Sequence, residues 1–281
     1  VRVLCDRGAG VWFEEPGYWL AREAFRAGAA RLLPVPVDAD GLDVATGIRR
    51  FRRARVVYVT PSHQYPLGAT LAAARRLQLL QWAAREGAWI IEDDYDGEYR
   101  FSSKPVESLQ GMDRHGRVLY IGTFSKVMFP SLRAGYLVVP PDLTNAFAAV
   151  RYAADIAPPF LIQETLTDFL AEGHFARHIQ RSRRLYARKQ SALLDLLAPV
   201  LGPSWTVHGA GAGMHITLST RRRLDDVKLS THAAKQRLWL WPLSPAYFAL
   251  PPRAGFILGF GSISDAELPE AVRRLSEILP P

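Results

Sequence analysis

The stretch Val118-Leu-Tyr-Ile-Gly-Thr-Phe-Ser-Lys-Val-Met-Phe-Pro-Ser-Leu-Arg-Ala-Gly-Tyr136 guides the interpretation of the whole chain. The apolar run from Val118 to Ile121 predicts a buried strand, and a loop containing Lys126 follows it. Arg133 comes seven residues after that lysine. A solvated surface lysine needs neither the strand nor the arginine, so this arrangement indicates an amine held in place for chemistry.

The side chains around Lys126 suit one type of reaction. A lysine that forms an imine with a phosphorylated aldehyde must be held out of bulk water, and the phosphate needs hydroxyl and guanidinium partners. Thr123 and Ser125 supply hydroxyl groups, and Arg133 supplies the guanidinium. We therefore interpret Lys126 as a lysine that binds pyridoxal 5′-phosphate (PLP). The alternative is an ordinary Ser-Lys pair on a surface loop.

Length and composition indicate a soluble globular protein. The 281 residues are 48% hydrophobic and 22% charged, enough for one large domain or two modest ones. The one cysteine, Cys5, cannot form an internal disulfide, which fits a reducing compartment. No signal peptide or membrane-spanning run is visible, so we expect a cytoplasmic protein without membrane contact.

The net charge of +8 raises the question of nucleic-acid binding. The densest basic cluster, Arg177 to Lys189, has the pattern of one face of a long helix and lacks the interleaved aromatic residues of RNA-binding surfaces. A solvated helix face explains it better than a nucleic-acid groove. No helix-turn-helix, zinc-finger or metal-site pattern is present within the chain.

Short apolar runs alternate with helical segments in the first half of the chain. Arg55–Thr60, Ala88–Ile91 and Val118–Ile121 predict buried strands, and Leu71–Glu86 predicts an amphipathic helix. This alternation predicts an α/β protein in which a mostly parallel sheet is covered by helices on both faces, a three-layer αβα arrangement.

The pattern changes after Pro141, where helical segments lead into a long helix from about His174 to Leu197. Short strands and a closing helix follow it. We therefore expect a large domain over residues 1–175, and a connecting helix with a smaller α+β domain over residues 176–281.

Polar side chains follow three of the predicted strands. They are Ser62-His63-Gln64, Asp93-Asp94-Tyr95, and Thr123 with Ser125 and Lys126. In open α/β sheets, ligands bind at the carboxyl ends of the strands. The three groups are therefore expected to meet at one site, which favours the cofactor interpretation of the lysine.

PLP chemistry requires a protonated pyridine nitrogen, which a nearby carboxylate favours. Asp93 is our candidate, although a strand-end acid that caps a turn is the alternative, and we interpret Asp94 and Asp96 in that way. Tyr95 is suited to donate a hydrogen bond to the ring oxygen, or it is a packed aromatic. Tyr18 follows a Pro-Gly turn and either stacks on the ring or belongs to the core.

Arg133 and Thr123 are the candidates for binding the phosphate. Ser125 either joins them or shapes the loop. His63 and Gln64 stand where the cofactor ring would lie and are candidates for contact with it, with a purely structural histidine as the alternative.

Four segments together resemble a known family. They are Glu-Glu-Pro-Gly-Tyr18, Thr-Pro-Ser-His-Gln-Tyr-Pro-Leu-Gly68, Glu-Asp-Asp-Tyr-Asp-Gly-Glu-Tyr-Arg100, and Gly-Thr-Phe-Ser-Lys-Val-Met-Phe-Pro-Ser-Leu-Arg-Ala-Gly-Tyr136. In this order they resemble the fold-type-I PLP-dependent aminotransferase module. The Pro-Ser-His-Gln segment resembles in particular the MocR subfamily of GntR-type bacterial transcription regulators, because plain aminotransferases usually carry Asn-Pro-x-Gly there.

The resemblance implies a role for each matching residue. Lys126 would form the internal aldimine and Asp93 would pair with the pyridine nitrogen. The remaining implied contacts are the ring oxygen for Tyr95, the ring face for Tyr18, and the phosphate for Thr123 and Arg133. A homodimer is also implied.

Two departures from the family pattern are visible. The chain begins just after the position of a winged-helix domain and a phosphate-binding loop, so we expect an N-terminally truncated module. Aminotransferases bind the substrate carboxylate through an arginine near the C-terminus, where this chain has Ile257. Arg237 and Arg253 are the possible substitutes.

The sequence is compatible with three alternative functions. The first is the PLP-binding effector domain of a MocR-type regulator, which senses an amino acid or a PLP adduct and contacts DNA only through a winged-helix domain outside this chain. The second is a free class I/II aminotransferase that moves an amino group between an amino acid and a 2-oxo acid. The third is a structural or dimerisation module that no longer binds PLP.

Overall fold

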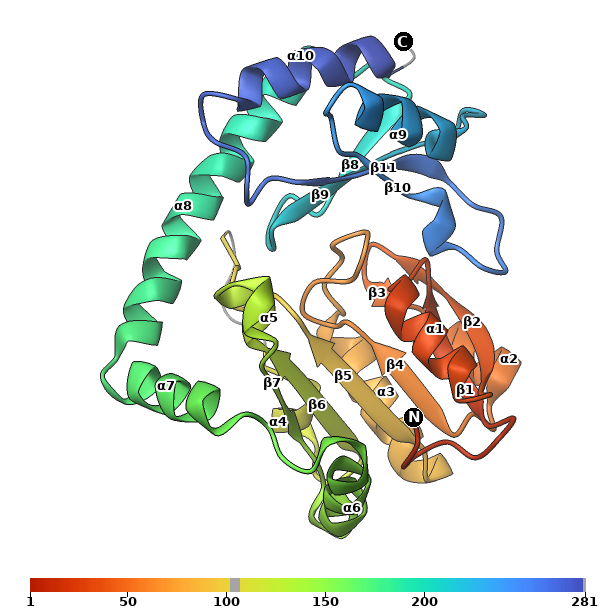
Figure 1. Ribbon diagram of the computed structural model, residues 1–281. Coiled ribbons are helices and arrows are strands. Elements are labelled where there is room, and N and C mark those ends of the chain that lie inside the picture. The colour runs from red at the N-terminus through yellow and green to blue at the C-terminus, as the bar shows by residue number, and fades with distance from the viewer. Residues whose placement is uncertain (102–106, 280–281) are drawn as a thin grey trace.

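Two β-sheets organise the computed structural model, which describes residues 1–101 and 107–279 (Figure 1). The larger sheet has the strand order β3-β2-β1-β4-β5-β6-β7. Its strands are β1 (Gly10–Glu15), β2 (Arg31–Asp38), β3 (Gly41–Leu42), β4 (Val56–Val59), β5 (Trp89–Asp94), β6 (Val118–Thr123) and β7 (Gly135–Val138). Only the edge strands β3 and β7 pair antiparallel to their neighbours, so the predicted mostly parallel sheet is confirmed.

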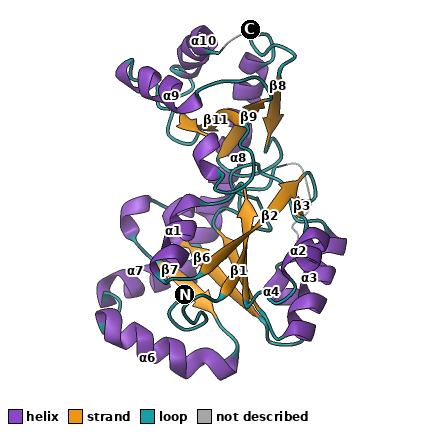
Figure 2. Ribbon diagram, turned by 90° about the vertical axis from the view of Figure 1, so that its right-hand side faces the viewer, coloured by secondary structure: helices purple, strands orange, loops and turns teal. Residues whose placement is uncertain are grey.

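Helices cover both faces of this sheet, as Figure 2 shows edge-on. They are α1 (Trp19–Ala27), α2 (Val44–Phe51), α3 (Ala73–Glu86), α4 (Leu109–Met112) and α6 (Thr144–Asp155). Successive side chains of a strand point to opposite faces. In β1, Trp12 stacks on Trp82 of α3 with ring centroids 3.8 Å apart, while Phe13 packs against Phe25 of α1 on the other face. The three-layer α/β arrangement follows from this alternation.

The second sheet is smaller and antiparallel, with the strand order β10-β11-β9-β8. Its strands are β8 (Trp205–His208), β9 (His215–Thr220), β10 (Trp241–Pro242) and β11 (Ala254–Gly259). Helices α8 (His174–Leu197), α9 (Asp226–Lys235) and α10 (Leu268–Ile278) accompany it, whereas α7 (Phe160–Ala171) lies beside the large sheet, near β7 (Figures 1 and 2). Figure 1 shows α8 running from the large sheet to the small one. The predicted domain boundary falls in the first turn of α8 and stays a prediction.

Helix α2 was not predicted from the sequence, and its packing explains why. Gly47 weakens the helical pattern, but a Cβ at that position would lie 2.8 Å from the Trp12 ring. The helix begins at Asp43, whose side chain accepts a hydrogen bond from the Thr46 amide at 2.9 Å. Tertiary packing thus requires a residue that local helix propensity disfavours.

The carboxyl ends of the parallel strands point towards the small sheet (Figure 1). At the end of β1, Oε1 of Glu15 accepts hydrogen bonds from the amides of Phe248, Ala249 and Leu250 at 2.7, 2.7 and 2.9 Å. The Gly68 and Gly209 backbones also approach closely, since a Cβ at Gly68 would lie 2.3 Å from the Gly209 Cα. The strand ends are therefore enclosed between the two sheets.

Among the described helices, none combines the length and apolar character needed to span a bilayer.

Candidate functional site

Lys126 lies in the one-turn helix α5 (Phe124–Val127), which directly follows β6. Thr123 begins this turn: its Oγ1 accepts a hydrogen bond from the Ser125 amide at 3.1 Å. The lysine side chain is exposed, and its charge acts on the buried His215 of β9. Lys126 therefore lies at the carboxyl end of β6, on the side of the large sheet that faces the small sheet.

Asp93 is held at the end of β5, the strand next to β6. The Tyr58 hydroxyl donates a hydrogen bond to its Oδ2. Burial raises the Asp93 pKa to about 6, the Tyr58 hydrogen bond opposes this, and the charges of Asp94 and Asp96 add to the rise. A cation placed against Asp93 would stabilise its ionised form.

Tyr58 was not singled out from the sequence. Its position within the apolar run of β4 gives it the appearance of a core residue, and only the sheet register places its hydroxyl beside Asp93.

Arg133 and Tyr18 share the electrostatic environment of Asp93. Burial raises the Tyr18 pKa, the negative charge of Asp93 raises it further, and the positive charge of Arg133 opposes both. Arg133 has backbone angles φ 50° and ψ 33°, is exposed, and makes no ion pair within residues 1–101 and 107–279. An unpaired guanidinium and a carboxylate thus lie near one tyrosine.

Aromatic rings line the same strand ends. Tyr18 and Tyr65 meet edge to face with ring centroids 5.4 Å apart, and Tyr65 and Tyr95 are 6.3 Å apart in the same geometry. Tyr65 belongs to the Pro-Ser-His-Gln-Tyr-Pro loop but was not predicted as a site residue. A flat ring ligand near Asp93 would meet these tyrosine rings.

The side-chain amide of Gln64 is hydrogen-bonded through both its nitrogen and its oxygen. Its amide nitrogen donates to the Pro16 carbonyl at 2.8 Å and to Glu14 at 3.2 Å, and its amide oxygen accepts from the Leu67 amide at 3.0 Å. The side chain is 1% exposed. These bonds give Gln64 a structural role, and its predicted contact with the cofactor stays a prediction.

Glu14 is a second buried carboxyl group that the sequence did not reveal. It bonds to the Thr60 hydroxyl at 2.6 Å and to the Thr60 amide at 3.2 Å. Burial raises its pKa to about 7, against the lowering effect of the Thr60 and Gln64 hydrogen bonds. Near neutral pH, Glu14 therefore binds a proton more readily than an exposed glutamate does.

Asp94 and Asp96 differ although both were interpreted as turn caps. Asp94 does cap the turn, accepting from the Gly97 amide at 3.1 Å, and it also accepts from the Tyr120 hydroxyl at 2.8 Å. For Asp96 the interpretation is wrong, because its buried carboxylate lies 3.0 Å from Nδ1 of His63.

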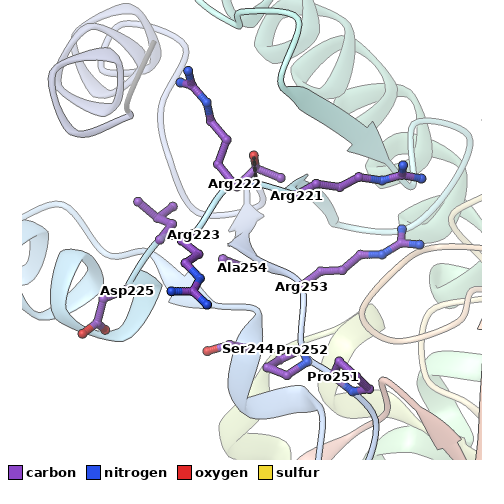
Figure 3. Close-up of a pocket in the computed structure, with 11 residues that line it drawn as sticks. Arg221, Arg222, Arg223, Asp225, Ser244, Pro251, Pro252, Arg253 and Ala254 are labelled. Atoms are coloured by element: carbon purple, nitrogen blue, oxygen red, sulfur yellow. Dashed lines mark hydrogen bonds between the residues drawn. The ribbon is translucent and has the colours of Figure 1, made fainter.

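The two arginines predicted for a substrate carboxylate lie in surface clefts of the small domain. Arg253 lines a cleft of about 680 Å³ together with Arg221, Arg222 and Arg223 (Figure 3). Arg237 lines a separate cleft of about 460 Å³ against α8 and α10. Neither cleft is lined by a residue from the carboxyl ends of the strands of the large sheet, so the geometry gives no support to these two predicted roles.

The position expected for that arginine is apolar. Ile257 in β11 is 6% exposed and packs with Leu67, Leu243 and Ala246. It therefore offers no charge to a ligand at the strand ends.

Comparison with known proteins agrees with this geometry. A family model described as aminotransferase class I and II matches residues 1–275. The probable rhizopine catabolism regulatory protein MocR of Rhizobium meliloti is 42% identical over 274 residues, which cover 98% of this chain and 55% of that protein. The pyridoxine biosynthesis transcriptional regulator PdxR of Corynebacterium glutamicum is 32% identical, over 97% of this chain and 58% of that protein. The chain thus spans little more than half the length of these relatives.

Solved structures of enzymes have the same fold. LysN, the α-aminoadipate aminotransferase of Thermus thermophilus solved with N-(5′-phosphopyridoxyl)-L-leucine, matches with a TM-score of 0.92 and 29% identity, over 99% of this chain and 72% of that chain. The kynurenine aminotransferase of Pyrococcus horikoshii also has a TM-score of 0.92, with 26% identity over 99% of this chain and 70% of that one. With its mostly parallel sheet and strand-end lysine, this chain belongs to the aminotransferase class I and II family.

Proposed function

We propose that this chain is the PLP-binding effector domain of a transcription regulator of the MocR type, with Lys126 as the cofactor lysine. The observation that carries the proposal is the set of groups at the strand ends: an amine, a partly buried carboxylate, an exposed guanidinium and hydroxyl groups. This donor set fits PLP, whose ring nitrogen, aldehyde and phosphate need these partners.

Each residue has a distinct task in this proposal. Asp93, oriented by the Tyr58 hydrogen bond, holds a proton on the ring nitrogen by opposite charge. Arg133 and Thr123 bind the phosphate, and Lys126 supplies the amine that holds the aldehyde carbon. When bound, PLP supplies an electron sink for reactions of an amino group.

The regulator is favoured over a free aminotransferase. The relative with 42% identity is named as a regulatory protein, whereas the transaminase of Thermus thermophilus is 29% identical. The buried Ile257 points in the same direction, because it provides no cation for the carboxylate of an amino-acid substrate.

The remaining parts of the proposal concern partners and location. The effector is an amino acid or its adduct with PLP, and DNA is bound by a winged-helix domain outside this chain. A homodimer is supported by the apolar side chains exposed on α6 and α7. A cytoplasmic location fits the free thiol of Cys5.

Absorbance spectroscopy of the full-length protein tests the role of Lys126. We expect added PLP to give a visible band that shifts from that of free PLP, and borohydride reduction to leave the cofactor mass on the peptide containing Lys126. Lys126→Ala should lose both signals because, within residues 1–101 and 107–279, the other lysines lie on α8 and α9 and not at the strand ends. Lys235→Ala, on α9, serves as the matched control and should keep them. An unchanged spectrum in Lys126→Ala would contradict the proposal.

A further inference from the structure

His63 and Asp96 form a hydrogen-bonded group with Tyr95, and the proposed function gives His63 and Asp96 no task. Nδ1 of His63 lies 3.0 Å from Oδ2 of Asp96 and 3.1 Å from the Tyr95 hydroxyl. His63 and Asp96 are each 2% exposed. Nδ1 of His63 is therefore within hydrogen-bond distance of two oxygen atoms, in a site closed to solvent.

The count of hydrogens decides where the Tyr95 proton goes. Nδ1 carries either one hydrogen or one lone pair. An ionised Asp96 only accepts, so His63 must donate from Nδ1, and the same N–H then reaches the Tyr95 oxygen. A protonated Asp96 would instead occupy the Nδ1 lone pair with its own hydrogen. In both cases Tyr95 cannot give its proton to His63, and that proton is free for another acceptor.

Close backbone packing fixes the histidine ring in this arrangement. A Cβ at Gly213 would lie 2.2 Å from His63 Cε1 and 2.6 Å from Asp96 Oδ2, and a Cβ at Gly68 would lie 2.8 Å from His63 Nε2. Both glycines have positive φ, at 74° and 68°. The ring therefore has no room to turn, and Gly213 belongs to the loop just before β9 of the small domain.

The other ring nitrogen supports the same proton assignment. Nε2 of His63 is buried and has no hydrogen-bond partner in the described part of the chain. The neighbouring His215 ring, with its centroid 4.9 Å away, is kept uncharged because burial lowers its pKa to about 3. A bare lone pair costs less there than an unpaired N–H, since a buried donor without an acceptor loses its hydration.

A metal ion is a less suitable explanation for this group. One ligand atom each from His63, Asp96 and His215 lies within 4.8 Å of the others. However, Nδ1 of His63 is already shared between two oxygens, and Nε2 of His215 lies 3.2 Å from the Pro66 carbonyl. Direct hydrogen bonds thus satisfy Nδ1 of His63 and Nε2 of His215 without an ion.

We propose that Asp96 and His63 act as positioning residues that set the direction of the Tyr95 hydroxyl proton, so that Tyr95 donates to the ring oxygen of the cofactor. This inference rests on the proposed function, because it requires PLP at the strand ends. Asp96 fixes the proton on His63, His63 donates to the Tyr95 oxygen, and Tyr95 presents its own proton to the ring.

Nitrogen NMR of the histidine rings tests the first half of this proposal without any cofactor. We expect one of the seven histidines to be a neutral ring protonated at Nδ1, and the signal to disappear in His63→Asn. Asp96→Asn should move the proton to Nε2, because the amide group is able to donate to Nδ1. A His63 ring protonated at Nε2 in the wild-type protein would overturn the proposal.

Cofactor affinity of the full-length protein tests the second half. Asp96→Asn and His63→Leu should each weaken PLP binding about tenfold, as expected for loss of an oriented hydrogen bond to a charged group. His63→Asn keeps an N–H near the position of Nδ1 and should stay within about threefold of the wild type.

The double variant separates positioning from a general structural role. In a Tyr95→Phe background, Asp96→Asn should cause no further loss of PLP affinity, because its effect passes through the hydroxyl. A full additional loss in that background would overturn the proposal, as would wild-type affinity in Asp96→Asn alone. Failure of the wild-type protein to bind PLP would refute the proposed function and with it the role of Tyr95, while the NMR result would still decide the proton position on His63.

Discussion

Glu14 and Asp93 are neighbouring carboxyl groups with different partners. Each has a raised pKa chiefly because burial penalises its charge, to about 7 for Glu14 and about 6 for Asp93. Asp93 has a hydroxyl partner and faces the strand-end site, whereas Glu14 is enclosed by Thr60 and Gln64. In our proposal the protonated ring nitrogen of the cofactor offsets the cost of burying the ionised Asp93, and the cofactor does not contact Glu14.

Glu14 should make the apo protein less stable at high pH. Its folded pKa of about 7 exceeds the ordinary value of 4.5, so the folded state holds the proton more tightly. The free energy of unfolding should therefore be highest below pH 4.5 and fall as the pH rises towards 7, by about 3 kcal/mol at about 1.4 kcal/mol per pH unit. Glu14→Gln cannot ionise, so its decline over this pH range should be smaller than that of the wild type by this amount.

Urea unfolding between pH 4.5 and pH 8 measures this difference. Glu164→Gln, at an exposed position on α7, is the control and should follow the wild type. Parallel pH profiles for the wild type and Glu14→Gln would show that Glu14 has no such role.

At the scale of elements, the sequence pattern predicted α3 and α8 well because their apolar positions repeat at helical spacing. It failed for α2, where Gly47 is selected by contact with Trp12. The strand ends were also located correctly, since three buried strands each end in polar residues. What the pattern did not show is how β1 is joined to a segment more than 230 residues later, through Glu15 and the Phe248 amide.

The Glu15 contact should be a major link between the large sheet and the small domain. Glu15→Ala leaves three backbone amides without an acceptor and should lower the free energy of unfolding by about 3 kcal/mol. Glu15→Gln keeps an acceptor oxygen and should lose about 1 kcal/mol. Denaturant unfolding monitored by fluorescence is the measurement. If the alanine variant were no less stable than the glutamine variant, the hydrogen bonds would not contribute as described.

The whole molecule has an apolar face formed by Tyr152, Ile156, Phe160 and Leu161, which lie on or between α6 and α7. Their exposed fractions are 68%, 70%, 74% and 77%. Contiguous exposed apolar residues usually mark an interaction site in a soluble protein. A second copy of the chain is the occupant that fits the proposed homodimer.

Replacing this apolar face should therefore dissociate the proposed homodimer. The double change Phe160→Glu and Leu161→Glu places two like charges on the face and should shift the protein to monomer in analytical ultracentrifugation, with unchanged circular dichroism. Leu77→Glu, on the exposed side of α3, is the control and should remain dimeric. A monomeric wild type, or a dimeric double variant, would exclude this face as the interface.

The sequence by itself determined the α/β class, the strand-end location of the site and the candidate cofactor lysine. These features depend on apolar spacing and on residues within a few positions of each other, which a single chain displays directly. Only the tertiary structure decided three hydrogen-bonded pairs: Tyr58 with Asp93, His63 with Asp96, and the Phe248 amide with Glu15. Those contacts join residues 33 to 233 positions apart, and their hydrogen-bond geometry arises only when separate strands and loops pack together. The Thr-Phe-Ser-Lys126 loop was therefore visible from the sequence, whereas the arrangement around it required the fold.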